Sequence, residues 1–132
     1  CGCSTGVENL KIARVTPKDY LNIFKSGKDH ILVDVREKVQ YDICRLPNSV
    51  NHAFVKLDEN VSELKKHVIR RTRKSSSDSL NVYCLCRRGI YSSLAVERLQ
   101  KSPGFPKGTK FVDIMGGIEA WARQVDPSFP VY

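Results

Sequence analysis

Short apolar runs alternate with amphipathic segments along most of the chain, and this order restricts the possible folds more than any other feature. Apolar runs of strand length lie at residues 31–34, 80–84 and 110–114, and a further short candidate lies at 49–52. Segments with apolar residues at helical spacing separate these runs. Consecutive strands that are joined through helices run parallel in one sheet. We therefore expect an α/β fold with a central parallel sheet.

The helices are predicted from their end signals and from their apolar spacing. In the first helix, Thr16 is a candidate N-cap, Pro17 suits the first helical position and Gly27 suits the end. The other predicted helices cover residues 39–43, a segment that contains Val61, Leu64 and Val68, residues 92–101 and residues 117–124. We interpret residues 1–12 as a linker tail and residues 13–132 as one domain, which is long enough for a single core.

The composition favours a folded protein without a membrane span. Hydrophobic residues make up 41% and charged residues 27% of the 132 residues, and no apolar run approaches the length that crosses a bilayer. No signal peptide is visible, so we expect a cytoplasmic protein with no membrane contact. The chain begins with Cys1 and not with methionine, which indicates a fragment of a longer protein.

The formal net charge of +8 suits an anionic partner, such as a small anion, an acidic protein surface or a nucleic acid. The densest basic run is Arg70–Lys74, which precedes a serine-rich stretch. We interpret the run and the serines together as a solvated loop. Because no aromatic residue lies within the run, it does not have the pattern of a single-strand nucleic-acid site, and we expect no direct nucleic-acid partner.

The five cysteines are an odd number in a chain without secretory signals, which favours reduced thiols over a disulfide framework. Two pairs, Cys1 with Cys3 and Cys84 with Cys86, have one residue between their members. Structural zinc sites place two or more residues between paired ligands, so we expect no metal site. Cys44 is more typical of a structural residue than of a second reactive thiol.

The segment Cys84–Ser93 lies between a predicted strand and a predicted helix, which is where ligands bind in open α/β sheets. A loop there directs backbone N–H groups at one point, and the following helix adds the positive end of its dipole. A thiol in that position is stabilised as the reactive thiolate. Spacing alone does not exclude Cys84, but the position in the loop favours Cys86 as the nucleophile. The residues expected to bind substrate are Arg87, Arg88, Gly89, Ile90, Tyr91 and Ser92.

Charged residues and a glycine are expected to support this site. Arg87 and Arg88 add positive potential, and Gly89 allows a backbone conformation that other residues avoid. At the end of the strand 31–34, Asp34 and Arg36 are expected to pair and to brace the sheet edge near the loop.

Three segments in the same order resemble the rhodanese family across nearly the whole chain. Residues 32–37 read Leu-Val-Asp-Val-Arg-Glu, the Cys86 segment follows, and residues 115–121 read Met-Gly-Gly-Ile-Glu-Ala-Trp. Residues 42–47 and 129–132 resemble a eukaryotic subfamily of these domains. The subfamily forms the C-terminal domain of adenylyltransferase–sulfurtransferases that activate molybdopterin synthase and a ubiquitin-related modifier. One departure is Tyr91, which stands where the subfamily usually has an acidic residue.

The resemblance implies a rhodanese-like fold, with helices on both faces of the sheet, and a sulfurtransferase that carries a persulfide on Cys86. The donor would be a persulfide donor protein or thiosulfate, and the Tyr91 departure leaves the preference between them open. The acceptor would be the adenylated C-terminal glycine of a ubiquitin-like sulfur carrier, in tRNA thiolation and molybdopterin synthesis. The resemblance also implies an upstream ATP-dependent activation domain and no cofactor in this domain.

Two other functions remain open from the sequence. Cysteine phosphatases that resemble this fold need an arginine six residues beyond the cysteine to grip the phosphate, and Ser92 stands at that position. The second alternative is a non-catalytic binding module on the same scaffold. Many such modules lose the cysteine, whereas this chain keeps Cys86 with two arginines beside it.

Overall fold

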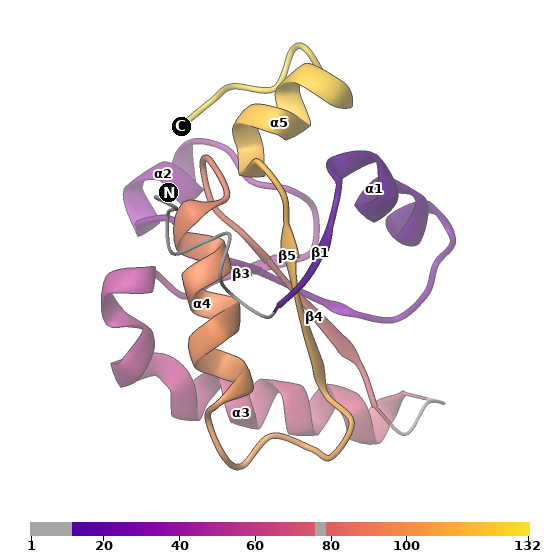
Figure 1. Ribbon diagram of the computed structural model, residues 1–132, viewed down its shortest axis with the longest axis vertical. Helices are drawn as coiled ribbons and strands as arrows, with labels where there is room; N and C mark the ends of the chain where they lie inside the picture. The colour runs from indigo at the N-terminus through magenta and orange to yellow at the C-terminus, as the bar shows by residue number, and fades with distance from the viewer. Residues whose placement is uncertain (1–11, 76–78) are drawn as a thin grey trace, which may run out of the picture.

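The computed structural model describes residues 12–75 and 79–132. Its centre is a five-stranded sheet in which every neighbouring pair of strands runs parallel, in the order β1-β5-β4-β2-β3 (Figure 1). This arrangement confirms the predicted α/β fold with a central parallel sheet. The strands are β1 (Ala13–Val15), β2 (Ile31–Asp34), β3 (Ser49–Asn51), β4 (Asn81–Leu85) and β5 (Lys110–Ile114).

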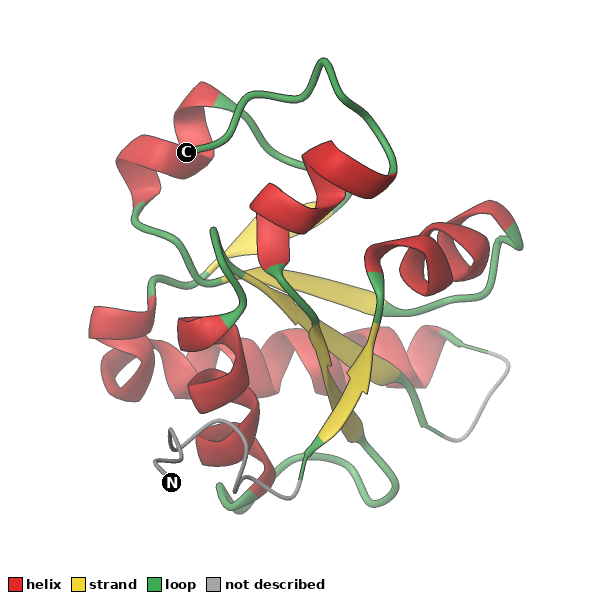
Figure 2. Ribbon diagram, turned by 45° about the horizontal axis from the view of Figure 1, so that its top comes forward, coloured by secondary structure: helices red, strands yellow, loops and turns green. Residues whose placement is uncertain are grey.

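Helices cover both faces of the sheet (Figure 2), as expected. The helices are α1 (Pro17–Lys25), α2 (Lys38–Ile43), α3 (Leu57–Lys74), α4 (Ile90–Gln100) and α5 (Gly117–Gln124), with a 3-10 turn, η2 (Phe54–Lys56), before α3. Alternate residues of β4 enter two separate clusters of buried side chains. Val82 packs in the cluster that contains Leu64 of α3, and Tyr83 packs with Tyr20 of α1 on the other face.

The first helix shows how local sequence signals set the element bounds. The hydroxyl oxygen of Thr16 accepts a hydrogen bond from the Asp19 backbone N–H at 3.1 Å. The Asp19 carboxylate accepts one from the Thr16 N–H at 3.4 Å, which completes a capping box. The predicted start of this helix at Thr16 and Pro17 is therefore confirmed.

Three details differ from the sequence-based expectations. The edge strand β1, only three residues long, was not predicted, because a run of that length has no clear period. Helix α4 begins at Ile90, two residues before the predicted start. The Arg70–Lys74 run forms the end of α3 and not a loop, since basic side chains favour the carboxyl end of a helix dipole.

Two sequence-based interpretations involve residues that lie outside the described part of the chain. The linker tail predicted for residues 1–12 coincides almost entirely with residues 1–11, and the serine-rich stretch includes residues 76–78. Within residues 12–75 and 79–132, none of the helices combines the length and the apolar composition that a membrane span requires.

Candidate active site

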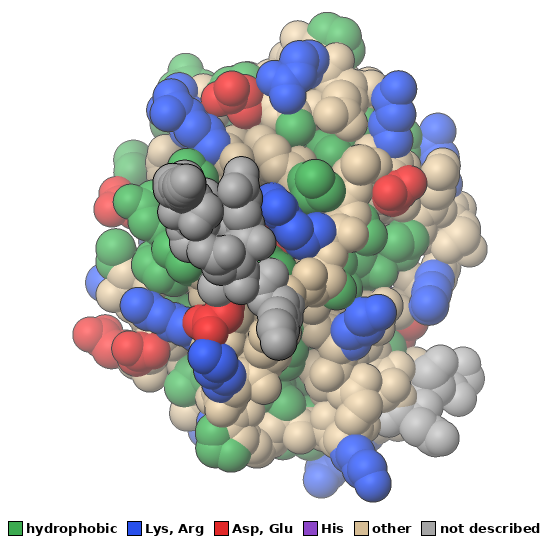
Figure 3. Space-filling view, in the orientation of Figure 1, with side chains coloured by type: hydrophobic (Ala, Val, Ile, Leu, Met, Phe, Trp, Pro, Cys, Tyr) green, Lys and Arg blue, Asp and Glu red, His purple; other side chains and the backbone are tan. Residues whose placement is uncertain are grey.

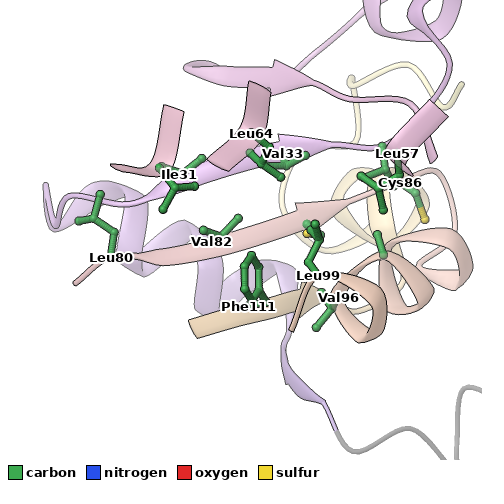
Figure 4. Close-up of a cluster of buried hydrophobic side chains, with 14 residues drawn as sticks. Ile31, Val33, Leu57, Leu64, Leu80, Val82, Cys86, Val96, Leu99 and Phe111 are labelled. Carbon is green, nitrogen blue, oxygen red and sulfur yellow. The ribbon is translucent and has the colours of Figure 1, made fainter. Parts of the chain in front are cut away.

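Cys86 is the first residue after β4, at the edge of the sheet where the parallel strands end. The connections that follow β2 and β5 start at the same edge, so three segments that are distant in sequence meet around this thiol. Its side chain lies at the end of a buried cluster, beside Leu57 (Figure 4), and is only 3% exposed. Four residues, 86–89, connect β4 to α4, and we call them the Cys86 loop.

The Cys86 loop directs a backbone donor at the sulfur. The Gly89 N–H donates to Cys86 Sγ with a nitrogen–sulfur distance of 2.9 Å. Gly89 has a φ of +89°, which is favourable for glycine alone, and a Cβ atom there would lie 2.6 Å from the backbone nitrogen of Gly116. The sequence predicted this need for glycine in the loop, but the close neighbour comes from the β5–α5 connection.

The carbonyl groups of the Cys86 loop are held by α5. The Ile118 N–H donates to the carbonyl oxygen of Cys86 at 2.8 Å, and the Glu119 N–H donates to that of Arg87 at 2.9 Å. The first N–H groups of a helix have no partners within the helix, so the loop satisfies them. Gly117 makes this approach possible, because a Cβ atom on it would overlap the Cys86 carbonyl oxygen.

The structure separates the roles of Cys84 and Cys86. Cys84 lies within β4, is completely buried, and is paired across the sheet with Val33 and Asp113. Burial raises the pKa of the Cys84 thiol strongly, and the nearby Asp113 carboxylate raises it further. Cys84 is therefore unsuited to act as a thiolate, whereas the Cys86 sulfur faces a backbone donor.

A pocket of about 740 Å³ opens above the Cys86 side chain. Of the residues predicted to bind substrate, Arg87, Arg88, Ile90 and Tyr91 line it, and their side chains are exposed. The other residues that line the pocket are Val35, Arg36, Glu37, Val39, Gln40, Phe54, Val55 and Cys86. Gly89 lies against the sulfur and is not part of this lining.

Ser92 does not face the pocket. Its side chain is completely buried, and its Oγ lies 3.3 Å from Cys86 Sγ on the side of the sheet. The Ser92 hydroxyl donates to Asp113 Oδ1 at 2.5 Å. Asp113 was not among the predicted site residues, although a charged residue between Val112 and Ile114 in a predicted strand was a usable signal.

Asp34 and Arg36 form a buried ion pair. Arg36 Nη2 lies 2.6 Å from Asp34 Oδ2, and Arg36 Nε lies 3.0 Å from both carboxylate oxygens. The same guanidinium donates to the carbonyl oxygens of Cys44 at 2.6 Å and of Tyr132 at 3.1 Å. Because Arg36 also lines the pocket, this network attaches the end of α2 and the C-terminal segment to the sheet edge beside Cys86.

Tyr91 takes part in a tilted aromatic contact at the pocket wall. Its ring centroid lies 5.2 Å from that of Phe54. The guanidinium of Arg98, a residue of α4, lies 4.6 Å from the same Phe54 centroid. Arg88 is paired with Glu119 at 3.4 Å, whereas Arg87 has no ion pair among the described residues. In the part of the chain that the structure covers, no group of three or more histidine, cysteine, aspartate or glutamate side chains could hold a metal ion.

Comparisons with known proteins place this geometry in a family. The chain matches the family model described as a rhodanese-like domain over residues 16–124. It is 36% identical over 126 residues to the adenylyltransferase and sulfurtransferase MOCS3 of Mus musculus, covering 90% of this chain and 27% of that protein. It is 40% identical over 152 residues to the adenylyltransferase and sulfurtransferase uba4 of Aspergillus niger, covering 100% of this chain and 31% of that protein. The chain thus spans less than a third of each of these relatives.

One solved structure with the same fold is Ygr203w of Saccharomyces cerevisiae, described as a homolog of single-domain rhodanese and of the Cdc25 phosphatase catalytic domain. It superposes with a TM-score of 0.75 at 17% sequence identity, covering 92% of this chain and 86% of that chain. At this identity the likeness concerns the fold alone.

The contact between Gly117 and the Cys86 loop leads to a testable prediction. Gly117→Ala should move the loop away from α5, lower the protein's stability and slow the alkylation of Cys86 about tenfold or more, because small displacements of a reactive group are costly. Gly27→Ala is the matched control, since Gly27 also has a positive φ but has open space around it, so it should show only a strain of about 1–2 kcal/mol. Denaturant unfolding and peptide-level mass spectrometry measure both effects. Equal losses of stability and of alkylation rate in the two variants would contradict the role given to the contact between Gly117 and the Cys86 loop.

Proposed function

The chain belongs to the rhodanese family, and from this premise we propose that it is a sulfurtransferase whose Cys86 carries a transferable sulfur as a persulfide. The observation that carries the proposal is the position of the Cys86 sulfur, which lies at the base of a pocket and accepts the Gly89 N–H. That donor, with the positive end of the α4 dipole, suits a negatively charged sulfur.

The proposed reaction has two parts. First, the Cys86 thiolate attacks the outer sulfur of the donor, the donor's S–S bond breaks, and the leaving group departs with the electron pair as sulfite or as a thiolate. The terminal sulfur on Cys86 then attacks the adenylated carboxyl carbon of the acceptor and displaces AMP. A second thiol must then attack the sulfur of Cys86 in the resulting S–S bond, which forms a disulfide with Cys86 and releases the acceptor as a thiocarboxylate.

Exposed apolar side chains around the pocket support a protein partner over a free small anion. Val39, Val55, Ile90 and Tyr91 line the pocket and are each more than half exposed. Thiosulfate gains nothing from apolar side chains, whereas clustered exposed apolar residues are typical of protein-binding sites. Because the Cys86 sulfur lies deep in the pocket, a protein partner has to insert a narrow segment, such as a chain terminus or a protruding loop.

The charge around the site is compatible with such a partner. Arg87 and Arg88 provide local positive charge at the mouth of the pocket. On the face shown in Figure 3, other Lys and Arg side chains are spread over the surface and not gathered into one patch. An acidic or phosphate-bearing segment would therefore be attracted mainly at the loop itself.

We propose the adenylated C-terminal glycine of a ubiquitin-like sulfur carrier as the acceptor, and a persulfide donor protein as the natural donor. The names of the relatives join adenylyltransferase and sulfurtransferase activities in one protein, which supports a role beside an ATP-dependent activation domain. Such a role would serve tRNA thiolation and molybdopterin synthesis. Tyr91, which replaces an acidic residue of the subfamily, extends the apolar wall and would favour an organic persulfide over thiosulfate.

The phosphatase alternative lacks its main requirement. Position 92, six residues beyond Cys86, holds a serine that is completely buried and hydrogen-bonded to Asp113. A phosphate above Cys86 would therefore lack the bidentate arginine that such enzymes use.

The first test of the proposal is sulfur loading. Incubation with thiosulfate should add one sulfur atom to the wild-type protein and to Cys84→Ala, and none to Cys86→Ala. Intact-mass and peptide-mass measurements locate the added sulfur, and cyanide should remove it as thiocyanate. An inactive Cys84→Ala together with an active Cys86→Ala would overturn the assignment.

The exposed arginines of the loop should attract anionic donors. Replacing both Arg87 and Arg88 by alanine should raise the KM for thiosulfate severalfold and flatten its dependence on salt concentration, because screened charges contribute less. The double variant Arg73→Ala, Lys74→Ala removes the same charge at the end of α3 and serves as the control. A KM at low salt that matches the wild-type value would exclude the two arginines from donor binding.

The role as a relay between proteins requires reconstitution. The domain joined to an adenylylation domain, with ATP, a persulfide donor protein and a ubiquitin-like carrier, should produce a thiocarboxylate at the terminal glycine of the carrier. The yield, measured by mass, should depend on Cys86. The relay fails as a proposal if Cys86→Ala gives the same yield as the wild-type domain, whatever its activity with thiosulfate.

A further inference from the structure

A buried carboxylate lies directly behind the reactive sulfur. Asp113 is the fourth residue of β5, is completely buried, and is paired across the sheet with Cys84 on one side and Arg14 on the other. Its Oδ1 accepts from Ser92, and its Oδ2 accepts from Arg14 Nε at 3.0 Å. The Ser93 hydroxyl, 3.0 Å from Oδ2, shares its one hydrogen between Oδ2 and the Gly89 carbonyl oxygen. Placing an anion here is costly for a nearby thiolate, because like charges repel.

The direction of the hydrogen bonds around Ser92 is set by Asp113. A serine hydroxyl has one hydrogen, and Ser92 donates it to Asp113 Oδ1 at 2.5 Å. Towards Cys86 the Ser92 oxygen can therefore only accept, and the Cys86 S–H donates to it at 3.3 Å. The thiol, the hydroxyl and the carboxylate form one continuous chain of two hydrogen bonds.

We propose that these two hydrogen bonds, from Cys86 to Ser92 and from Ser92 to Asp113, take up the proton of Cys86 when the thiolate forms. This role rests on the proposed function of Cys86 as sulfur carrier. The S–H bond breaks, its electron pair stays on the sulfur, and the proton bonds to Ser92 Oγ. In the same step the Ser92 hydroxyl proton passes to Asp113 Oδ1, which becomes a neutral carboxylic acid. Ser92 touches the reacting sulfur, whereas Asp113 acts through Ser92 and is a positioning residue.

The transfer preserves the number of charges and improves the hydrogen bonding of the sulfur. Afterwards Asp113 donates to Ser92, and the Ser92 hydroxyl donates to the Cys86 thiolate, so both hydrogen bonds persist with reversed direction. The thiolate then has two donors, Ser92 and the Gly89 N–H. Because the proton is placed on Oδ1, the bond of Oδ2 to Arg14 stays intact.

Other charged and titratable groups surround the Cys86–Ser92–Asp113 hydrogen bonds. Some are bonded to these residues or paired with them across the sheet, and others line the pocket above them or pair with the Cys86 loop. They are Arg14, Arg36, Glu37, Cys84, Arg87, Arg88, Tyr91 and Glu119. Arg14, Arg87 and Arg88 favour a thiolate at Cys86 electrostatically, and an ionised Asp113 opposes it. Removing the charge of Asp113 should therefore slow Cys86 alkylation if Asp113 accepts the proton, and should speed it if Asp113 acts only as a repelling charge.

The proton relay predicts a particular dependence of Cys86 reactivity on pH. When one proton is shared between a thiol and a carboxylate, a fixed fraction of the sulfur stays as thiolate below the main titration. The rate of Cys86 alkylation should thus show a plateau on the acidic side of its profile, over the range in which the thiol and the carboxylate together hold one proton. If Asp113 only anchors α4, the rate should fall about tenfold for each pH unit with no plateau.

Iodoacetamide, with peptide-level mass spectrometry at Cys86, measures this profile without any sulfur donor. Asp113→Asn and Ser92→Ala should lose the plateau and react about tenfold or more slowly at its acidic end. Ser93→Ala is the matched control. Ser93 is equally buried, and its hydroxyl bonds both the same carboxylate and the Gly89 carbonyl oxygen, but it has no bond to the sulfur, so the plateau should remain. Thermal unfolding of each variant reports on the fold, and Ser92→Ala tests the relay without a change of charge.

Three results would overturn the relay. They are a wild-type profile without a plateau, a plateau that survives in Ser92→Ala, and an Asp113→Asn variant that reacts faster than wild type throughout the acidic range. The last result would show that Asp113 acts only as a repelling charge. Sulfur loading of Cys86 is measured separately, so failure of the proposed sulfurtransferase function and failure of the relay are distinguishable.

Discussion

The contact between the Cys86 loop and the first turn of α5 is the interaction on which the rest of the site depends. The N–H groups of Ile118 and Glu119 need acceptors, and the carbonyl oxygens of Cys86 and Arg87 provide them. With those carbonyl groups held by α5, the Gly89 N–H is directed at the sulfur. A buried donor left without a partner costs about 1–3 kcal/mol, so the loop and the helix stabilise each other's position.

The second constraint is the balance of charge beneath the loop. Asp113 would be expensive to bury alone, and it is compensated by Arg14 of β1 and by Ser92 and Ser93 in the first turn of α4. The same helix terminus stabilises negative charge on Cys86. Cys86 and Asp113 therefore share the electropositive start of α4. A proton that moves from one to the other leaves a single negative charge in this region.

The pocket above the sulfur is assembled from segments that are far apart in the chain. Arg36 connects the end of β2 to the Cys44 and Tyr132 carbonyl groups, which places α2 and the C-terminal segment beside the site. The contact between the Phe54 and Tyr91 rings joins η2 to α4 at the same pocket. The mouth of the pocket combines exposed apolar side chains with Arg87 and Arg88, and the sulfur below it accepts a backbone N–H, a combination that suits a carrier protein with a reactive terminus.

The sequence by itself determined the α/β class, most strand and helix positions, and the place of Cys86 between a strand and a helix. These features depend on local periodicity and capping, as in the box formed by Thr16 and Asp19, so they can be read from neighbouring residues. Only the tertiary structure showed the short strand β1 and the helical end of α3, where local signals are weak or ambiguous. It also placed Ser92 behind the sulfur and Asp113 next to Ser92. That placement follows from the order β1-β5-β4, in which lateral pairing brings Arg14, Asp113 and Cys84 side by side, and no local pattern encodes which strands become neighbours.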